Sequence, residues 1–130
     1  MNDSEFVRAF EACTLPNSDF HHADHVRVAW LYLRDKPLLM ALDSFCTGLR
    51  RFAAAHGKPG LYHETITWAY LLLIHERREC MPSGHAWDDF AAANADLLQW
   101  RPSILRRYYR EETLQSDFAR RVFVLPDRAL

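Results

Sequence analysis

The sequence has few cysteines, and none of them belongs to a recognisable cysteine motif. Its three cysteines, Cys13, Cys46 and Cys80, are far apart and form no C-x-x-C pair. A disulfide framework or a thiolate zinc knuckle is therefore not expected. Reduced thiols favour a cytoplasmic protein, and the first residues lack the basic and apolar regions of a signal peptide, which favours the same location.

Other absences exclude several classes of partner and reaction. No stretch contains the roughly 18 uninterrupted apolar residues that suggest a membrane span. Sixteen basic and seventeen acidic residues give a net charge of −1, which provides no overall field to attract nucleic acid or anionic lipid. The sequence also lacks G-x-G-x-x-G, Walker, G-x-S-x-G and H-E-x-x-H motifs, so nucleotide binding, serine hydrolysis and zincin proteolysis have no support.

What the sequence does contain is typical of a folded helical protein. Hydrophobic residues make up 49% and charged residues 25% of the 130 residues, so we expect a single domain over residues 1–130. Apolar residues repeat with a helical period almost throughout, and no sustained strand-like alternation is present. We therefore predict an all-α fold, a compact bundle of about four main helices with short terminal helices.

Capping residues and breakers set the expected helix bounds. Asp3 or Ser4 is an N-cap candidate for the first helix, and Gly57 suits the left-handed position that closes the third. The fourth helix is apolar on all sides between Ile66 and Ile74, which predicts the central, most buried element. The expected helices span about 3–14, 17–34, 37–56, 62–79, 87–98, 102–110 and 116–122.

One face of the third expected helix forms a continuous apolar seam. Its members repeat at four-three spacing, as in a packed bundle helix. They are Leu38, Leu42, Phe45, Leu49, Phe52 and His56.

Two histidine motifs are the most informative local patterns. The first is Phe20-His21-His22-Ala23-Asp24-His25-Val26 and the second is Tyr62-His63-Glu64-Thr65-Ile66-Thr67. A helical wheel puts His22 and His25 beside the apolar face of the second helix and His21 on its flank. His63 shares a face with Ile66 and Tyr70, whereas Glu64 is rotated about 100° away.

These motifs predict a metal centre. An H-x-x-H pair met by a histidine from a facing helix supplies three ligands and leaves positions open for water, dioxygen or substrate. We predict that His22, His25 and His63 hold one divalent transition metal, with iron favoured and copper or zinc as alternatives. One alternative is that these histidines are helix caps, partly exposed surface groups or core residues that bond to backbone carbonyls. Another is acid–base use without a metal.

Glu64 and Tyr70, which lie on the same expected helix as His63, are candidates for a catalytic role. Glu64 would complete the ligand set or act as a general base for bound water, although a glutamate in a first helical turn is also favoured by the helix dipole alone. Tyr70 would hydrogen-bond a substrate or a reactive oxygen species, although an aromatic residue at helical spacing also serves core packing.

The leading functional hypothesis is a small metal-dependent enzyme, an oxidoreductase or oxygenase that acts on a small molecule. An aromatic, buried site favours dioxygen chemistry over hydrolysis, although zinc hydrolysis would use the same ligands. The competing hypothesis is a non-catalytic helical module for binding or metal sensing, whose histidines are structural.

A local basic patch lies near the C-terminus. Tyr108 and Tyr109 are interleaved with six arginines between positions 101 and 121, against three acidic residues. Mixtures of arginine and aromatic residues can bind single-stranded nucleic acid, but the nearly neutral net charge of the whole chain argues against this. A solvated face, or an arginine fork for an acidic substrate tail, is favoured.

The motifs F-H-x-x-D-H-V, followed by A-W-L-Y-L, and Y-H-E-T-I-T-W resemble those of a set of short bacterial all-helical proteins without an established activity. The resemblance extends to Phe123-Val124-Leu125-Pro126-Asp127 and covers most of the chain. It implies a single helical unit and no particular mechanism. In general architecture the expected site also resembles small histidine-metal bundles such as the DinB-like proteins.

Overall fold

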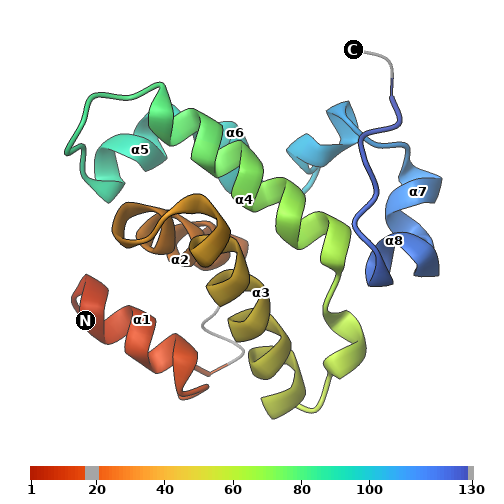
Figure 1. Cartoon of the computed structure of the whole chain (residues 1–130), viewed down its shortest axis with the longest axis horizontal. Coiled ribbons are helices and arrows are strands. Elements are labelled where there is room, and N and C mark those ends of the chain that lie inside the picture. Colours follow the sequence, from red (N-terminus) through yellow and green to blue (C-terminus); the bar gives the residue numbers. More distant parts are fainter. Residues whose placement is uncertain (17–20, 129–130) are drawn as a thin grey trace.

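The computed structural model describes residues 1–16 and 21–128, and in this part of the chain it is all-α, as predicted, without any strand (Figure 1). The three longest helices are α2 (His22–Asp35), α3 (Leu38–Ala55) and α4 (Glu64–Glu79), and each contacts the other two. The shorter elements are α1 (Asp3–Glu11), the 3₁₀ helix η2 (Pro59–Leu61), α5 (Trp87–Ala93), α6 (Ala95–Leu98), the 3₁₀ helix η3 (Ile104–Arg107), α7 (Glu111–Gln115) and α8 (Asp117–Arg121).

The short elements cover different sides of the three-helix core. Helix α1 contacts α2 and α3, α6 contacts α2, and η3 and α8 contact α4. In Figure 1, α4 crosses the molecule with α1 and α3 on one side and α7 and α8 on the other. Helix α4 is central, as predicted, because it contacts α2, α3, η3 and α8, and its Leu71 and Ile74 are fully buried. The prediction that it is the most buried element is wrong, because Leu72 is 37% exposed and the shorter α2 buries as many residues.

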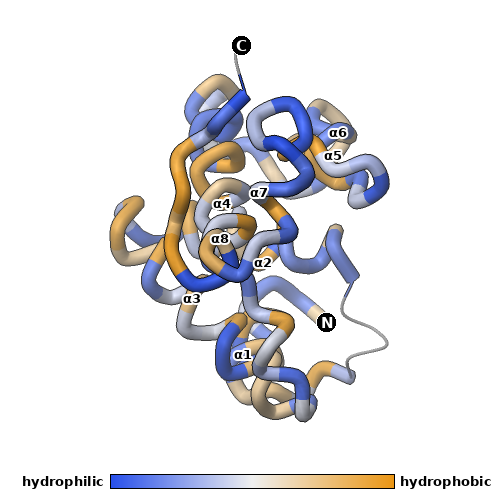
Figure 2. Tube along the Cα trace, turned by 90° about the vertical axis from the view of Figure 1, so that its right-hand side faces the viewer, coloured by the Kyte–Doolittle hydropathy of each residue, from blue (hydrophilic) through white to orange (hydrophobic). Residues whose placement is uncertain are grey.

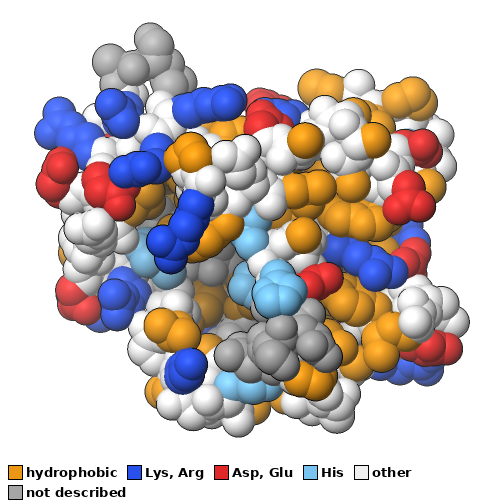
Figure 3. All heavy atoms as spheres, turned by 180° about the vertical axis from the view of Figure 1, so that it is seen from behind, with side chains coloured by type: hydrophobic (Ala, Val, Ile, Leu, Met, Phe, Trp, Pro, Cys, Tyr) orange, Lys and Arg blue, Asp and Glu red, His pale blue; other side chains and the backbone are white. Residues whose placement is uncertain are grey.

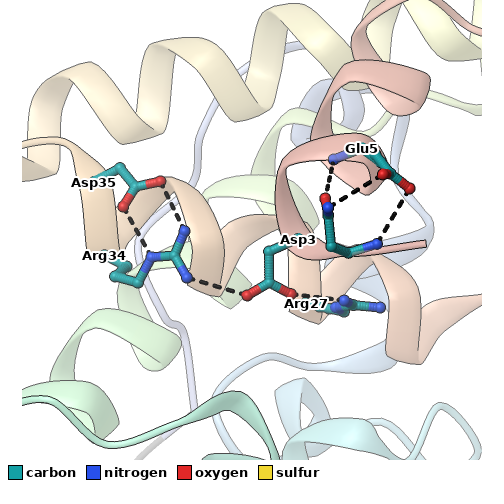
Figure 4. A network of polar contacts seen from close by, with 6 residues as sticks. Asp3, Glu5, Arg27, Arg34 and Asp35 are labelled. Atoms are coloured by element: carbon teal, nitrogen blue, oxygen red, sulfur yellow. Dashed lines mark hydrogen bonds and ion pairs between the residues drawn. The ribbon is translucent and has the colours of Figure 1, made fainter.

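An ion-pair network attaches α1 to the core (Figure 4). Asp3 accepts hydrogen bonds from Arg27 at 2.7 Å and from Arg34 at 3.1 Å, and Arg34 also pairs with Asp35 at 2.8 Å. The hydrogen bond from Arg27 is the main reason why the pKa of Asp3 lies below its usual value. Helix α1 is thereby held against two turns of α2.

A buried threonine attaches the C-terminal segment to α4. The Thr65 hydroxyl lies within hydrogen-bond distance of the carbonyls of Ala119 at 2.7 Å and Val122 at 2.9 Å, and it accepts a bond from the Val124 N–H at 3.1 Å. Figure 2 shows hydrophobic residues along the segment that follows α8. This side of α4 is therefore covered by sequence nearly 60 residues away.

Several helix bounds differ from the expected ones for local reasons. The cap of α1 is Asn2, whose side chain accepts from the Glu5 N–H at 2.8 Å, and not Asp3 or Ser4. Helix α1 ends at Glu11, and Cys13 has a positive φ of 58°. The expected start of the second helix at Asn17 or Ser18 lies outside the described residues, and α2 is assigned from His22.

The later elements also depart from the prediction. Helix α4 begins two residues late because His63 caps it. The expected helix over 87–98 breaks at buried Asn94, whose side chain donates to the Phe90 carbonyl and accepts from Arg77. Only η3 forms within 102–110, and α7 was not expected. The left-handed Gly57 is confirmed, with a φ of 72°. None of the helices in the described ranges has the length and apolar character to cross a bilayer.

Candidate functional site

A cavity of about 380 Å³ lies among α2, α3 and α4. The loop around η2 and the exposed Trp100 complete its lining. Figure 3 shows histidine side chains around a hollow on the face opposite to the view of Figure 1. The cavity walls are mainly apolar and aromatic, and its polar lining residues are His22, His25, His56, Lys58, Tyr62, His63, Thr67 and Tyr70.

The helical-wheel predictions for α2 and α4 are confirmed at this cavity. His22 and His25 both line it, and so do His63 and Tyr70, whereas Glu64 does not. The structure therefore brings together the three histidines predicted as metal ligands around one space. No carboxylate occurs among the described lining residues.

His22 is held in one orientation and one tautomer. Its Nε2 lies 2.9 Å from the Leu97 carbonyl oxygen, and because a carbonyl can only accept, Nε2 must carry the proton. The ring lies edge-on to Tyr70, with centroids 4.7 Å apart, and 5.0 Å from the ring of Trp100. In the neutral ring the lone pair is therefore on Nδ1. Burial lowers the pKa of His22 and favours this neutral form.

His63 has both ring nitrogens engaged. Its Nδ1 accepts from the Ile66 N–H at 3.1 Å, which caps α4, and its Nε2 donates to the Leu114 carbonyl at 2.7 Å. The ring thus joins the start of α4 to α7. Burial is the main cause of its lowered pKa, and a metal could bind this ring only if one of the two bonds were broken.

The other two cavity histidines differ in environment. Burial, followed by the nearby positive charges that His22 and His21 would carry, lowers the pKa of His25 to about 4. His56 closes α3, donates from Nδ1 to the Phe52 carbonyl at 3.0 Å and stacks on the Phe52 ring with centroids 4.2 Å apart. As in His22, a backbone carbonyl determines the tautomer, here with the lone pair on Nε2.

Glu64, predicted as a ligand or base, is engaged outside the cavity lining. Its carboxylate accepts from the Tyr62 hydroxyl at 2.6 Å, from Arg50 at 2.9 Å and from the Trp68 indole at 3.1 Å. Three donors from α3, α4 and the residue after η2 therefore surround it. In this arrangement Glu64 positions Tyr62, which itself lines the cavity.

Tyr70 lines the cavity, and its hydroxyl shares a hydrogen bond of 2.6 Å with Ser103 Oγ. The Ser103 hydroxyl also accepts from the Leu105 N–H at 3.1 Å. Burial raises the pKa of Tyr70, so its hydroxyl keeps its proton. The ring forms a wall of the cavity, while the hydroxyl connects α4 to the start of η3.

The metal hypothesis receives no geometric support from these contacts. Within residues 1–16 and 21–128, no group of three or more histidine, cysteine, aspartate or glutamate side chains is placed so that it could hold a metal ion. The binding of a divalent metal by His22, His25 and His63 therefore stays a prediction.

His56 and Trp100, on which the functional proposal below depends, were not assigned to the site from the sequence. His56 belongs to the four-three seam that was recognised on α3, and this seam also contributes Phe45, Leu49 and Phe52 to the cavity. Its helical spacing was the available signal. Trp100 lies after α6 and reaches His22 only through the tertiary fold, so no local pattern pointed to it.

No family model, curated protein or solved structure matches this chain.

Proposed function

We propose that the protein binds a small organic molecule with an apolar, preferably aromatic, body and a proton-donating group such as a hydroxyl. The observation that carries this proposal is an apolar cavity bordered by His22 and His56, whose tautomers are both determined by backbone carbonyls. The ligand would occupy the space among α2, α3 and α4.

The shape and composition of the cavity support an apolar ligand body. Small-molecule sites typically measure about 300–1,000 Å³ and are lined by hydrophobic and aromatic side chains with a few polar groups. The volume of about 380 Å³ falls within this range. Phe45 and Phe52 are buried, whereas Trp100 is 43% exposed. A planar ring would fit between these aromatic walls, which favour offset or edge-on stacking.

The histidine tautomers support a ligand that donates a proton. His22 uses its Nε2–H on Leu97 and His56 uses its Nδ1–H on Phe52, so each neutral ring retains only an acceptor nitrogen. Among the lining residues that the structure describes, Lys58 is the one with a formal charge, and none of them is a carboxylate. A cationic ligand would meet this ammonium group, so a neutral or weakly acidic ligand is favoured.

The same geometry would support acid–base chemistry at a bound hydroxyl. The hydroxyl proton would move to Nδ1 of His22, and the resulting imidazolium would still donate from Nε2 to the Leu97 carbonyl. A base that is oriented by a second acceptor is a common catalytic arrangement. Tyr70 would contribute its ring as a wall, since its hydroxyl bonds to Ser103.

A matched pair of probes tests this proposal. We expect 1-naphthol to bind about fivefold more tightly than 1-methylnaphthalene, because a hydrogen bond contributes about 1 kcal/mol net. Calorimetry or quenching of the tryptophan fluorescence would measure both affinities. In His22→Gln, whose amide can still donate to Leu97, the ratio of the two affinities should be smaller. His75→Gln, at a half-buried position outside the cavity lining, is the matched control. Failure of both probes to bind, or equal affinity for the two, would overturn the proposal.

A second candidate is the mononuclear metal centre of an oxidoreductase or oxygenase, with iron favoured over copper or zinc. One observation favours it, namely that His22, His25 and His63 line the same cavity. Metal binding would require His63 to release Leu114 or Ile66. Protein purified without a histidine tag should then carry near-stoichiometric metal that is lost in His22→Ala and His25→Ala. Absence of metal after reconstitution with each of the three ions would exclude this candidate.

A further inference from the structure

A second concave site lies on the other side of Tyr62 and is lined by Arg50, Pro59, Gly60, Tyr62, Arg120 and Arg121. Half of these residues are arginines, and no acidic residue occurs among them. Arg50 comes from α3 and the other two arginines from α8, so two distant parts of the sequence bring their positive charges to one place. We propose that this arginine site binds a phosphate-like anion.

Each guanidinium group is held in place by one acceptor. Arg50 donates through Nη2 to both Glu64 oxygens, at 2.9 and 3.0 Å, and its guanidinium carbon lies 4.6 Å from the centre of the Tyr62 ring. Arg120 donates through Nη1 to the Gly60 carbonyl at 3.1 Å. Arg121 donates through Nε to Asp117 at 2.8 Å. Because each contact uses only one nitrogen, other N–H groups remain to bind an oxyanion.

The balance of charge at this place also favours an anion. Two carboxylates, Glu64 and Asp117, pair with Arg50 and Arg121, whereas no ion pair is formed between Arg120 and any described residue. The side chain of Glu64 is only 16% exposed, while that of Arg50 is 52% exposed. At the second pair both side chains are accessible, with Arg121 63% and Asp117 75% exposed. Three arginines against two carboxylates leave a net positive charge in this concavity, which favours a counter-ion.

Guanidinium geometry determines the class of ligand. A planar fork of N–H donors matches the oxygens of phosphate or carboxylate in a bidentate manner. Converging arginines from two elements suit a group with several anionic oxygens, such as a phosphate monoester or a diphosphate, better than a single carboxylate. This site shares Tyr62 with the histidine-lined cavity but presents different charged groups, and its assignment does not rest on the function proposed for that cavity.

Pyrophosphate and inorganic phosphate are the probes for this site, titrated into the full chain at about 0.15 M ionic strength so that general surface attraction is screened. We expect saturable binding by calorimetry and chemical-shift changes confined to the surroundings of Arg50 on α3, to η2 with Tyr62, and to α8. Arg120→Gln should weaken pyrophosphate binding about tenfold, because a charge-assisted hydrogen bond is lost. The affinity of Arg120→Lys, which keeps the charge but not the planar fork, should lie between those of the parent protein and of Arg120→Gln.

Arg8→Gln is the matched control, because it removes one charge from an exposed position on α1, away from this site. Its affinity for pyrophosphate should equal that of the parent protein. Equal weakening in Arg8→Gln and Arg120→Gln would show that only net charge matters and would overturn the assignment. No saturable binding of either probe, or an unchanged affinity in Arg120→Gln, would also overturn it. Far-UV circular dichroism of each variant checks that the helices are retained.

Discussion

Lowering the pH should destabilise the fold through His25. A pKa of about 4 in the folded protein, against 6.5 for an ordinary histidine, means that the unfolded chain takes up a proton more readily than the folded one. The contribution to stability is therefore complete above pH 6.5 and is lost as the pH falls towards 4. With about 1.4 kcal/mol for each pKa unit, the full loss is about 3 kcal/mol, of which about 2 kcal/mol develops between pH 7 and pH 4.5.

The difference between the parent protein and His25→Gln isolates this contribution. Urea unfolding followed by circular dichroism at about pH 7 and pH 4.5 gives the free energy of unfolding of each protein. Carboxylates titrate in the same range, and the lowered pKa values of His22 and His63 act with the same sign. These effects are common to both proteins, so the variant should lose about 2 kcal/mol less than the parent on acidification.

Two results would refute this reasoning. The first is an equal loss of stability in the parent and in His25→Gln over the same pH interval. The second is an NMR titration in which the His25 ring takes up its proton near pH 6.5, as an exposed imidazole does. Either result would show that the His25 ring contacts water in the folded protein. The cavity among α2, α3 and α4 would then hold more water than its apolar lining indicates.

Two further substitutions test how α1 packs on α3 and how the C-terminal segment is attached to α4. Gly48→Ala would place a Cβ 2.5 Å from Cε2 of fully buried Phe10. Overpacking should outweigh the gain in helix propensity and lower the free energy of unfolding in urea by about 1–2 kcal/mol. Adding Phe10→Leu to this variant should restore most of the loss. An unchanged midpoint in Gly48→Ala would contradict the close approach of α1 and α3. Thr65→Val removes the hydroxyl that joins α4 to the segment after α8. We expect the free energy of unfolding to fall by about 2 kcal/mol and the Val124 amide to exchange its hydrogen faster. Thr65→Ser keeps the hydroxyl and should preserve the protection of that amide.

The local pattern of the sequence determined most of the helical framework and the direction of its key side chains. Helical periodicity places residues three and four apart on one face, which is why His22 and His25, and likewise His63 and Tyr70, could be assigned to common inward faces before any tertiary contact was known. The same spacing placed Phe52 and His56 on one face of the third helix, and both line the cavity. These relations are determined within a single helix.

Only the tertiary structure decided what those side chains do. The tautomer of His22 depends on the carbonyl of Leu97, and the engagement of His63 depends on Leu114, 75 and 51 residues away in the sequence. Glu64 meets Arg50 of α3, and Arg120 reaches Gly60, again through packing of separate elements. Periodicity specifies a face, but hydrogen-bond partners depend on how the helices are arranged in space, so the chemistry of the cavity and of the arginine site arises from long-range contacts.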